Sequence, residues 1–202
     1  VIKDDQTPAM ARGNRIHEDA AAYLRGQSDT LPNAKAIDKF TSLFKQLREI
    51  PAKLIETKWA FTSDWKLTGY FSKGLRPAWL RVITDACVIY EDGDADVIDH
   101  KTGKRYGSND DQMELFALGT FAYADWAVNV TTRLWYLDDG GEEIAEYSRK
   151  DFDSLKRKWE GLVEPMFADE TFAPRPNDKC HFCPMSRSNH DGRKGLPRCR
   201  FG

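Results

Sequence analysis

The sequence predicts an α/β fold: a central mixed β-sheet flanked by helices, with an irregular, cysteine-containing C-terminal tail. Two apolar runs of strand character, separated by the turn-forming segment 91–95, predict a β-hairpin at the centre of the sheet. Several longer segments repeat their apolar residues at helical spacing, which predicts helices that pack on the sheet. At 202 residues, the chain is long enough to bury a sizeable core.

The N-terminal part is expected to contain two helices and then a strand. Residues 11–25 predict the first helix, and Gly26 is suited to end it. Residues 34–49 predict the second helix, with apolar side chains at helical spacing. Residues 52–62 predict the first strand, and residues 63–78 a loop that contains Trp, Gly and Pro.

The remaining elements include the central hairpin, whose strands are predicted over residues 80–90 and 95–101. After it we expect a helix with a broad apolar surface, a strand with a hairpin partner, and an amphipathic helix, over residues 110–126, 131–137, 142–148 and 151–167. From Thr171 to Gly202 the sequence has no helical or strand period, and this tail would be disordered without a staple.

Charge and composition restrict the partners and the compartment. The net charge of −2 argues against a surface that binds polyanions generally, so a nucleic-acid partner requires local positive charge. The segment from Arg175 onwards, with seven Lys or Arg against two Asp, is one such place. No apolar run approaches the length that spans a bilayer, so no membrane partner is expected. Four cysteines are too few for a disulfide scaffold of this size, which favours a reducing cytoplasm.

The chemistry is expected at the ends of the two hairpin strands. Asp99 and Lys101 are two residues apart, so strand alternation places them on one face and His100 on the other. Asp85 ends the preceding apolar run, and pairing of the two strands would bring Asp85, Asp99 and Lys101 towards a common point. Two carboxylates can hold a divalent cation, and a nearby lysine can orient a water or stabilise a charged transition state.

Four further residues have positions that fit such a site. Gly13 and His17 are four residues apart and lie on one face of the first helix. Glu56 interrupts the first strand and joins the acids if it shares a face with Asp85, and Gln112 lies in the first turn of the helix after Lys101. Taken alone, His17 and Glu56 have plainer interpretations, as a surface histidine and as a solvent-facing strand glutamate.

In order along the chain, these features are Gly13-x3-His17, Glu56, Asp85, the segment 99–103 (Asp-His-Lys-Thr-Gly) and Gln112-x3-Phe116. This series resembles the PD-(D/E)xK nuclease superfamily, and within it the RecB-like exonucleases of phage type or of the CRISPR-associated kind. His100 and Phe116 stand where tyrosines are usual. The resemblance covers residues 11 to 125, and four motifs in the right order make it specific although each is short.

The resemblance implies a restriction-endonuclease-like core over residues 1–170 that binds Mg²⁺ or Mn²⁺. The implied metal ligands are His17, Asp85, Asp99 and the backbone carbonyl of His100. Lys101 would position or activate the attacking water. Glu56 would complete the acid cluster, and Gln112 would contact a phosphate or a bound water. Hard oxygen ligands suit these cations, whose charge polarises a phosphodiester.

The cysteine-rich tail, residues 171–202, is a candidate second metal site. Cys180 and Cys183 have the Cys-x2-Cys spacing with which two thiolates grip one metal, and His190 and Cys199 would complete four ligands for zinc. The resemblance instead suggests an iron–sulfur cluster, for which related enzymes use one cysteine upstream of the Gly-x3-His helix and three in the tail. No cysteine precedes Gly13 in this sequence, and Cys87 is better explained as a buried strand residue. Zinc, a cluster and no metal all remain open. With a metal, the tail is expected to pack on the nuclease domain.

The function that the resemblance implies is a metal-dependent DNA exonuclease in a bacterial or phage-infected cytoplasm, serving phage recombination, repair or DNA degradation. Linear single- or double-stranded DNA would be the substrate, with a recombinase or single-strand annealing protein as a possible partner. Three alternatives are a zinc-stapled interaction domain in which the tail is the functional part, an endonuclease of nicking or restriction type, and a non-catalytic DNA-binding module. The complete set of two acids and a lysine argues against the last.

Overall fold

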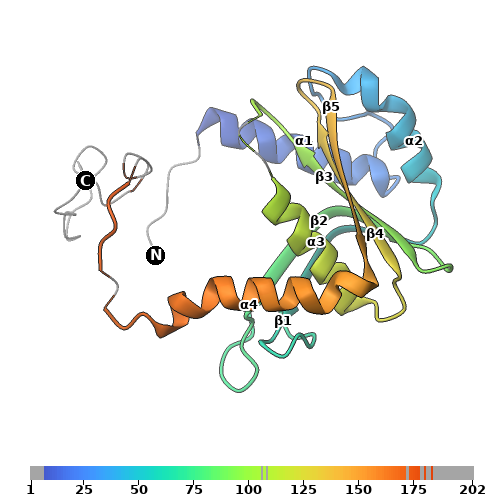
Figure 1. Ribbon diagram of the computed structural model, residues 1–202. Helices are drawn as coiled ribbons and strands as arrows, with labels where there is room; N and C mark the ends of the chain where they lie inside the picture. Colours follow the sequence, from blue (N-terminus) through green and yellow to red (C-terminus); the bar gives the residue numbers. More distant parts are fainter. Residues whose placement is uncertain are drawn as a thin grey trace. The chain divides into compact units, whose positions relative to one another are not determined.

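The computed structural model describes residues 7–105, 107, 109–171, 173–177, 180 and 183. The chain contains both helices and strands, with helices before, between and after groups of strands (Figure 1). In chain order the elements are α1 (Pro8–Leu24), η1 (Ile37–Phe40), α2 (Thr41–Glu49), β1 (Lys53–Phe61), β2 (Leu80–Ile89), β3 (Asp94–Lys101), α3 (Asp110–Tyr123), β4 (Asn129–Tyr136), β5 (Gly141–Ser148), η2 (Arg149–Asp151) and α4 (Phe152–Ala168).

The five strands form one sheet in the order β1-β2-β3-β4-β5. Neighbouring strands are antiparallel, except that β3 and β4 are parallel. Strands β2 and β3 form the hairpin that the sequence predicts, with Ala86 opposite Ile98 and Ile89 opposite Ala95. The parallel step from β3 to β4 contains α3, as such a connection requires a crossover. The predicted mixed sheet flanked by helices is therefore confirmed.

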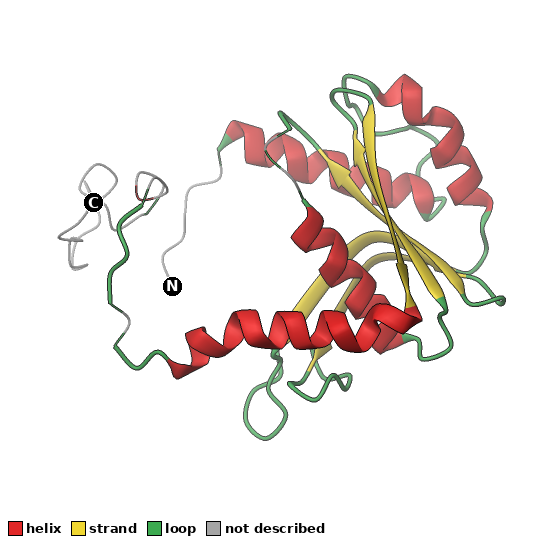
Figure 2. Ribbon diagram, in the orientation of Figure 1, coloured by secondary structure: helices red, strands yellow, loops and turns green. Residues whose placement is uncertain are grey.

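Helices cover both faces of the sheet and create two apolar cores (Figure 2). On one face α1 and α2 bury a core with β2, β3 and β4, whose largest side chains include Leu24, Phe44, Val88, Trp135 and Leu137. On the other face α3 buries a second core, whose members include Trp59, Phe61, Val97, Met113 and Phe121. Cys87 lies in this second core, fully buried, as the sequence predicts.

In both β1 and β2, the alternation of side chains between the two faces of the sheet shifts by one residue at one position, which we call the exchange of faces. Alternate residues of a regular strand share a face, so Val82 and Cys87, five residues apart, should face opposite sides. Both nevertheless belong to the core beneath α3, whereas Ala86 belongs to the core beneath α1 and α2. The β1–β2 register skips Glu56 and Asp85, and Glu56 has a φ of 52°. The exchange therefore falls on two of the acids that the sequence singles out.

The predicted helix over residues 34–49 is wrong in its first part. The backbone N–H groups of Lys35 and Ala36 donate to Oδ1 of Asp138 and to the carbonyl of Leu137, beyond the end of β4. These long-range bonds hold the segment outside a helix, so a 3₁₀ turn comes first and α2 begins only at Thr41. The other predicted elements agree with the observed bounds to within about three residues at each end.

The packing of the backbone divides the chain into two units. One comprises Pro8–Trp159 and contains the whole sheet, and the other comprises Val1–Thr7 and Glu160–Gly202. The division into residues 1–170 and a tail, 171–202, that packs on them stays a prediction. Among the described helices, none combines the length and the apolar character that a membrane span requires.

Candidate active site

Asp85 lies where β2 separates from β3. The register of the two strands ends at Ala86 and Ile98. Next to this last pair, Oδ2 of Asp85 accepts a hydrogen bond from the backbone N–H of His100 at 2.5 Å. The side chain of Asp85 therefore takes the place of a backbone carbonyl where the backbone hydrogen bonds between β2 and β3 end. Oδ1 of the same carboxylate lies 2.9 Å from Nδ1 of His17 on α1. A single buried carboxylate thus links two strands and a helix.

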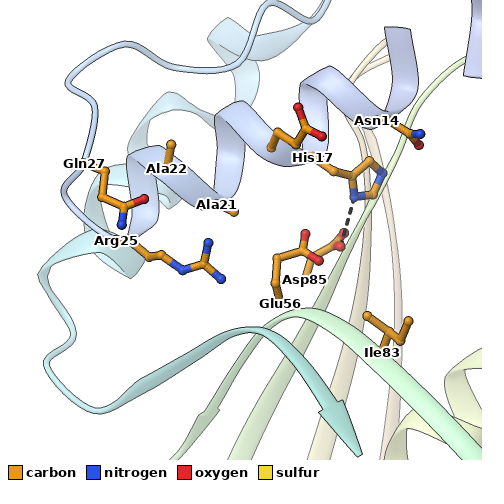
Figure 3. A pocket seen from close by; sticks show the side chains of 10 residues that line it. Asn14, His17, Ala21, Ala22, Arg25, Gln27, Glu56, Ile83 and Asp85 are labelled. Atoms are coloured by element: carbon orange, nitrogen blue, oxygen red, sulfur yellow. Dashed lines mark hydrogen bonds and ion pairs between the residues drawn. The ribbon is translucent and has the colours of Figure 1, made fainter. Parts of the chain in front are cut away.

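Helix α1 reaches Asp85 because a glycine lets it approach the end of β3. A Cβ added at Gly13 would lie 3.2 Å from Oγ1 of Thr102, which is a tight contact. One helical turn later, His17 points from α1 toward Asp85 (Figure 3). The predicted Gly-x3-His arrangement therefore has the geometry expected of it: close backbone approach at the glycine and a directed imidazole at the histidine.

An ion pair fixes the same helix from its other side. The two terminal guanidinium nitrogens of Arg12, Nη1 and Nη2, donate to the carboxylate of Asp138 at 2.8 and 2.7 Å. Asp138 also accepts the backbone N–H of Gly103, at 2.7 Å, and that of Lys35. The hydrogen bonds from Arg12 lower the pKa of Asp138 well below its usual range. We call Arg12, Asp138 and Gly103 the α1 clamp, because they join the start of α1 to the ends of β3 and β4.

Asp99 and Lys101 lie together on the α3 side of β3, as strand alternation predicts. Nζ of Lys101 lies 2.8 Å from Oδ2 of Asp99 and donates to Oε1 of Gln112 at 2.6 Å. Nε2 of Gln112 in turn donates to Oδ1 of Asp99 at 3.3 Å. Gln112 therefore orients the acid and the lysine in this structure, whereas the resemblance assigns it a contact with phosphate or water.

The two acids of the hairpin differ in their electrostatic surroundings. Burial and the negative charge of Asp85 raise the pKa of Asp99 to about 6, although Lys101 opposes the shift. Burial also opposes ionisation of Asp85, but the hydrogen bond from His17, the charge of His17 and the hydrogen bond from the backbone N–H of His100 outweigh it and lower the pKa of Asp85. The same hydrogen bond raises the pKa of His17. The site therefore concentrates negative charge that a cation would neutralise.

Glu56 lies beside Asp85 on a pocket of about 550 Å³ between α1 and the β1–β2 strands (Figure 3). His17 and Ile83 also line this pocket, which opens to solvent. Burial and the charge of Asp85 raise the pKa of Glu56. Its left-handed backbone is uncommon for a glutamate and is the kind of local strain that functional sites retain. The structure thus places Glu56 beside Asp85, and its role in the acid cluster stays a prediction.

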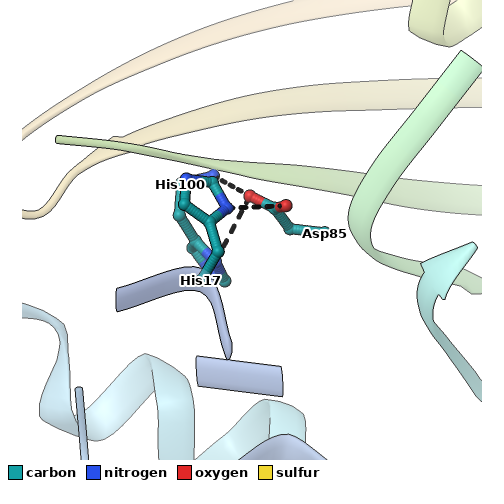
Figure 4. Close-up of side chains that lie close together, drawn as sticks. All are labelled: His17, Asp85 and His100. Atoms are coloured by element: carbon teal, nitrogen blue, oxygen red, sulfur yellow. Dashed lines mark hydrogen bonds and ion pairs between the residues drawn. The ribbon is translucent and has the colours of Figure 1, made fainter. Parts of the chain in front are cut away.

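The imidazole of His100 lies on the face of β3 opposite Asp99 and Lys101. It stacks on Phe44, with ring centroids 5.1 Å apart, and packs against Trp135 at 5.6 Å. Even so, its Nδ1 lies 3.4 Å from Oδ2 of Asp85, because Asp85 sits at the strand separation and is accessible from this face (Figure 4). Complete burial lowers the pKa of His100 to about 4, so the ring is neutral at physiological pH.

These side chains fit a divalent cation. Ligand atoms of His17, Asp85 and His100 all lie within 4.8 Å of one another, and neither ring nitrogen of His100 has a hydrogen bond to a described residue (Figure 4). Neutral imidazole and carboxylate are both ligands of divalent metals. The sequence predicts the backbone carbonyl of His100 as a metal ligand. Strand alternation did not predict that the imidazole of His100 would lie close to Asp85. A bound cation would supply positive charge that polarises a phosphodiester.

The α1 clamp also had no signal in the sequence. Asp138 stands in the run Asp138-Asp139-Gly140-Gly141, which reads as a polar hairpin turn between β4 and β5. Its partners are 126 residues away at Arg12 and 35 residues away at Gly103. Only the tertiary arrangement distinguishes this aspartate from its exposed neighbour.

The tail is described at few positions. The backbone N–H of Cys183 donates to the carbonyl of Cys180 at 3.0 Å, which places the two cysteines on one tight turn. The backbone N–H of Asn177 points at Sγ of Cys180, at 3.3 Å. His190 and Cys199 lie outside the described residues. The four-ligand site in the tail, and the choice between zinc and an iron–sulfur cluster, therefore stay predictions.

A β-hairpin holds two acids and a lysine, and a neighbouring helix directs a histidine at one of the acids. This arrangement defines a class of metal-dependent nucleases. The chain belongs to the PD-(D/E)XK nuclease superfamily, whose sequence profile matches residues 2–188. Membership implies metal-dependent nuclease activity on DNA. A search of curated proteins finds no significant match.

Among solved structures that match the chain is one described as the crystal structure of SSO0001. It shares 13% sequence identity with this chain and aligns with a TM-score of 0.38. The alignment covers 91% of this chain and 85% of the other.

Proposed function

We propose that this protein is a divalent-metal-dependent DNA exonuclease of the RecB-like type. The observation that supports this proposal most directly is the contact between His17 and Asp85, at 2.9 Å. It joins the Gly-x3-His helix to the acids of the hairpin, and that helix is the motif by which the sequence resembles RecB-like enzymes in particular. Phage recombination, repair or DNA degradation in the cytoplasm would be its cellular role.

In this proposal the residues divide into those that bind the cation and those that act beside it. His17, Asp85, Asp99 and the carbonyl of His100 would hold Mg²⁺ or Mn²⁺. Lys101 would orient the attacking water and stabilise charge that develops on the phosphate oxygens. Its ammonium is suited to this role because Asp99 and Gln112 hold it in place. Glu56, on the pocket side, would complete the acid cluster.

A nuclease assay on three DNA substrates tests the proposal. Linear duplex and single-stranded DNA, each labelled at one end, and closed circular DNA are incubated with Mg²⁺ or Mn²⁺. We expect stepwise loss of nucleotides from linear DNA and intact circles. Lys101→Met should reduce the rate at least about a hundredfold, the scale of a lost proton-transfer or water-positioning group. The matched control is Lys104→Met, because Lys104 is an exposed lysine three residues further on.

The alternatives give different results in the same assay. Cleavage of closed circles would show an endonuclease and contradict the exonuclease assignment. Binding of DNA with no cleavage under any divalent cation would indicate a non-catalytic module. Full activity of Lys101→Met would contradict the role of the hairpin itself. A recombinase or annealing partner is a separate proposal, and co-purification of the full chain with such a protein would test it.

A further inference from the structure

A basic and aromatic surface continues from the candidate active site along β1 and β2. Residues 58–81, the end of β1, the β1–β2 loop and the start of β2, contain five basic side chains and one acidic one. The basic residues are Lys58, Lys66, Lys73, Arg76 and Arg81. This local charge of +4 lies in a chain whose net charge is −2. Segment 58–81 is therefore a second place of local positive charge, in addition to the segment from Arg175 onwards.

The strand register connects this surface to the acids. Lys58 pairs with Ile83, and Ala60 pairs with Arg81, so these pairs follow Glu56 and Asp85 along the two strands. Ile83 and Asp85 line the same pocket (Figure 3), and Ile83 is 41% exposed. Asp85 is four residue steps along the strand from Arg81, a distance of about 13 Å. The row of exposed side chains is therefore long enough to accompany several nucleotides away from the acids.

Aromatic side chains stand at the far end of this row. The ring centroid of Tyr70 lies 5.9 Å from Nζ of Lys58 and 5.8 Å from Cζ of Arg81. Phe71 packs edge-on against Tyr70, with centroids 5.1 Å apart, and is 79% exposed. By contrast, Trp65 of the same loop is buried and packs on other aromatic rings. The loop therefore has separate aromatic residues for the interior and for the surface.

The loop is held in shape by its own hydrogen bonds. Hydroxyl groups of Thr68 and Ser72 both donate to the carbonyl of Arg76, at 2.9 and 2.7 Å. Nε of Arg81 donates to the carbonyl of Tyr70 at 2.6 Å, which attaches the loop to β2. A platform that is already ordered loses less conformational entropy when a ligand binds to it.

We propose that Lys58, Ile83, Arg81, Tyr70 and Phe71 form a track for single-stranded DNA that leads to the acid cluster. Basic side chains would contact the phosphates, and the exposed ring of Phe71 would stack on an unpaired base. A duplex offers its phosphates but hides the faces of its bases, so the aromatic end of the track favours a single strand. This inference rests on the proposed nuclease function and adds the form of DNA that the site receives.

Binding without hydrolysis tests the track separately from catalysis. The full chain is titrated into a fluorescently labelled oligo(dT) in EDTA, and anisotropy gives the Kd. We expect Phe71→Ala to weaken binding roughly tenfold, within the range for loss of one stacked base. Lys58→Glu, a charge reversal at an exposed basic residue of the track, should also weaken it and reduce its salt dependence. The matched controls are Trp126→Ala and Lys45→Glu, which change exposed residues outside residues 58–81.

The outcomes separate the two proposals. Unchanged binding by Phe71→Ala, in a protein that degrades DNA, would overturn the track and leave the nuclease proposal intact. Weakened binding in a protein that cleaves no DNA would support the track and contradict the nuclease. If Phe71→Ala weakened duplex and oligo(dT) binding equally, or if the control variants weakened it as much, the single-strand assignment would be wrong. Circular dichroism of every variant checks that the fold is retained.

Discussion

At the scale of single residues, Asp85 has the largest number of partners in the candidate site. It accepts a backbone N–H from β3, contacts His17 on α1 and lies 3.4 Å from the buried imidazole of His100. Groups that contact and orient a metal ligand affect metal affinity almost as strongly as the ligands themselves. His100 therefore deserves a test independent of its backbone carbonyl, which every substitution retains.

His100→Phe separates the ring nitrogen from the ring packing. Phenylalanine can still stack on Phe44 and fill the space beside Trp135, but it has no atom that can contact Asp85 as a ligand or donor. We expect Mn²⁺ affinity, measured by calorimetry, to fall about tenfold. The melting temperature should stay close to that of the unmodified protein. Unchanged affinity would show that His100 has a packing role only.

Asp99 makes metal binding dependent on pH. Burial and the neighbouring Asp85 raise its pKa to about 6, and a protonated carboxyl is a poor metal ligand. Protons therefore compete with the cation as the pH falls through about 6, and Mn²⁺ affinity should decrease from pH 7.5 to pH 5.5. Asp99→Asn should bind more weakly and lose the part of this pH dependence that comes from Asp99, whereas protonation of His17, whose pKa is also raised, still competes with the cation. Equal affinity at both pH values in the unmodified protein would contradict the raised pKa.

At the scale of elements, the exchange of faces in β1 and β2 places Glu56 and Asp85 together. Glu56 has a φ of 52°, a region that costs a residue with a Cβ about 1–2 kcal/mol and costs glycine almost nothing. Glu56→Gly and Glu56→Ala both remove the carboxylate, so their difference reports the backbone. We expect the glycine variant to be the more stable by about 1 kcal/mol in urea unfolding. An alanine variant of equal or higher stability would contradict this.

The α1 clamp should stabilise the fold in a pH-dependent way. Asp138 has a lowered pKa in the folded protein, so its contribution is complete above the unfolded pKa, about 4, and is lost as the pH falls toward the folded value. Asp138→Asn should reduce the free energy of unfolding at pH 7 by about 2 kcal/mol, typical of lost hydrogen bonds to a charge. The difference from the unmodified protein should narrow at pH 3. A constant difference would contradict the linkage.

The sequence predicts the regular helices and strands well, but it predicts backbone irregularities and contacts between elements poorly. Alternation along β3 was sufficient to place Asp99 and Lys101 on one face, because the strand is regular there. Alternation fails at Glu56, because a left-handed glutamate leaves no mark in the sequence. The helical spacing of apolar residues fails to predict the structure of residues 34–36, because hydrogen bonds to the end of β4 hold this segment outside a helix. The failure at residues 34–36 comes from contacts that are distant in sequence, whereas the failure at Glu56 comes from its own backbone conformation.

At the scale of the whole molecule, the distribution of charge matters more than its sum. A net charge of −2 predicts weak interaction with a polyanion. Lys58 and Arg81 of segment 58–81 instead lie on the strands that contain Glu56 and Asp85, and the other basic residues of the segment lie on the loop that joins these strands. Sequence composition reveals the cluster only once the β1–β2 register shows which residues continue from the site.

The central claim is that His17, Asp85 and Asp99 form a binding site for the catalytic cation. The most direct test is a calorimetric titration of the metal-free protein with Mn²⁺, which needs no knowledge of the DNA substrate. We predict saturable binding, weakened at least tenfold in Asp85→Asn, on the scale of a lost ligand or its support. Asp19→Asn, a change at an exposed aspartate on the same helix as His17, should bind like the unmodified protein. Equal binding by Asp85→Asn and the unmodified protein would contradict the claim.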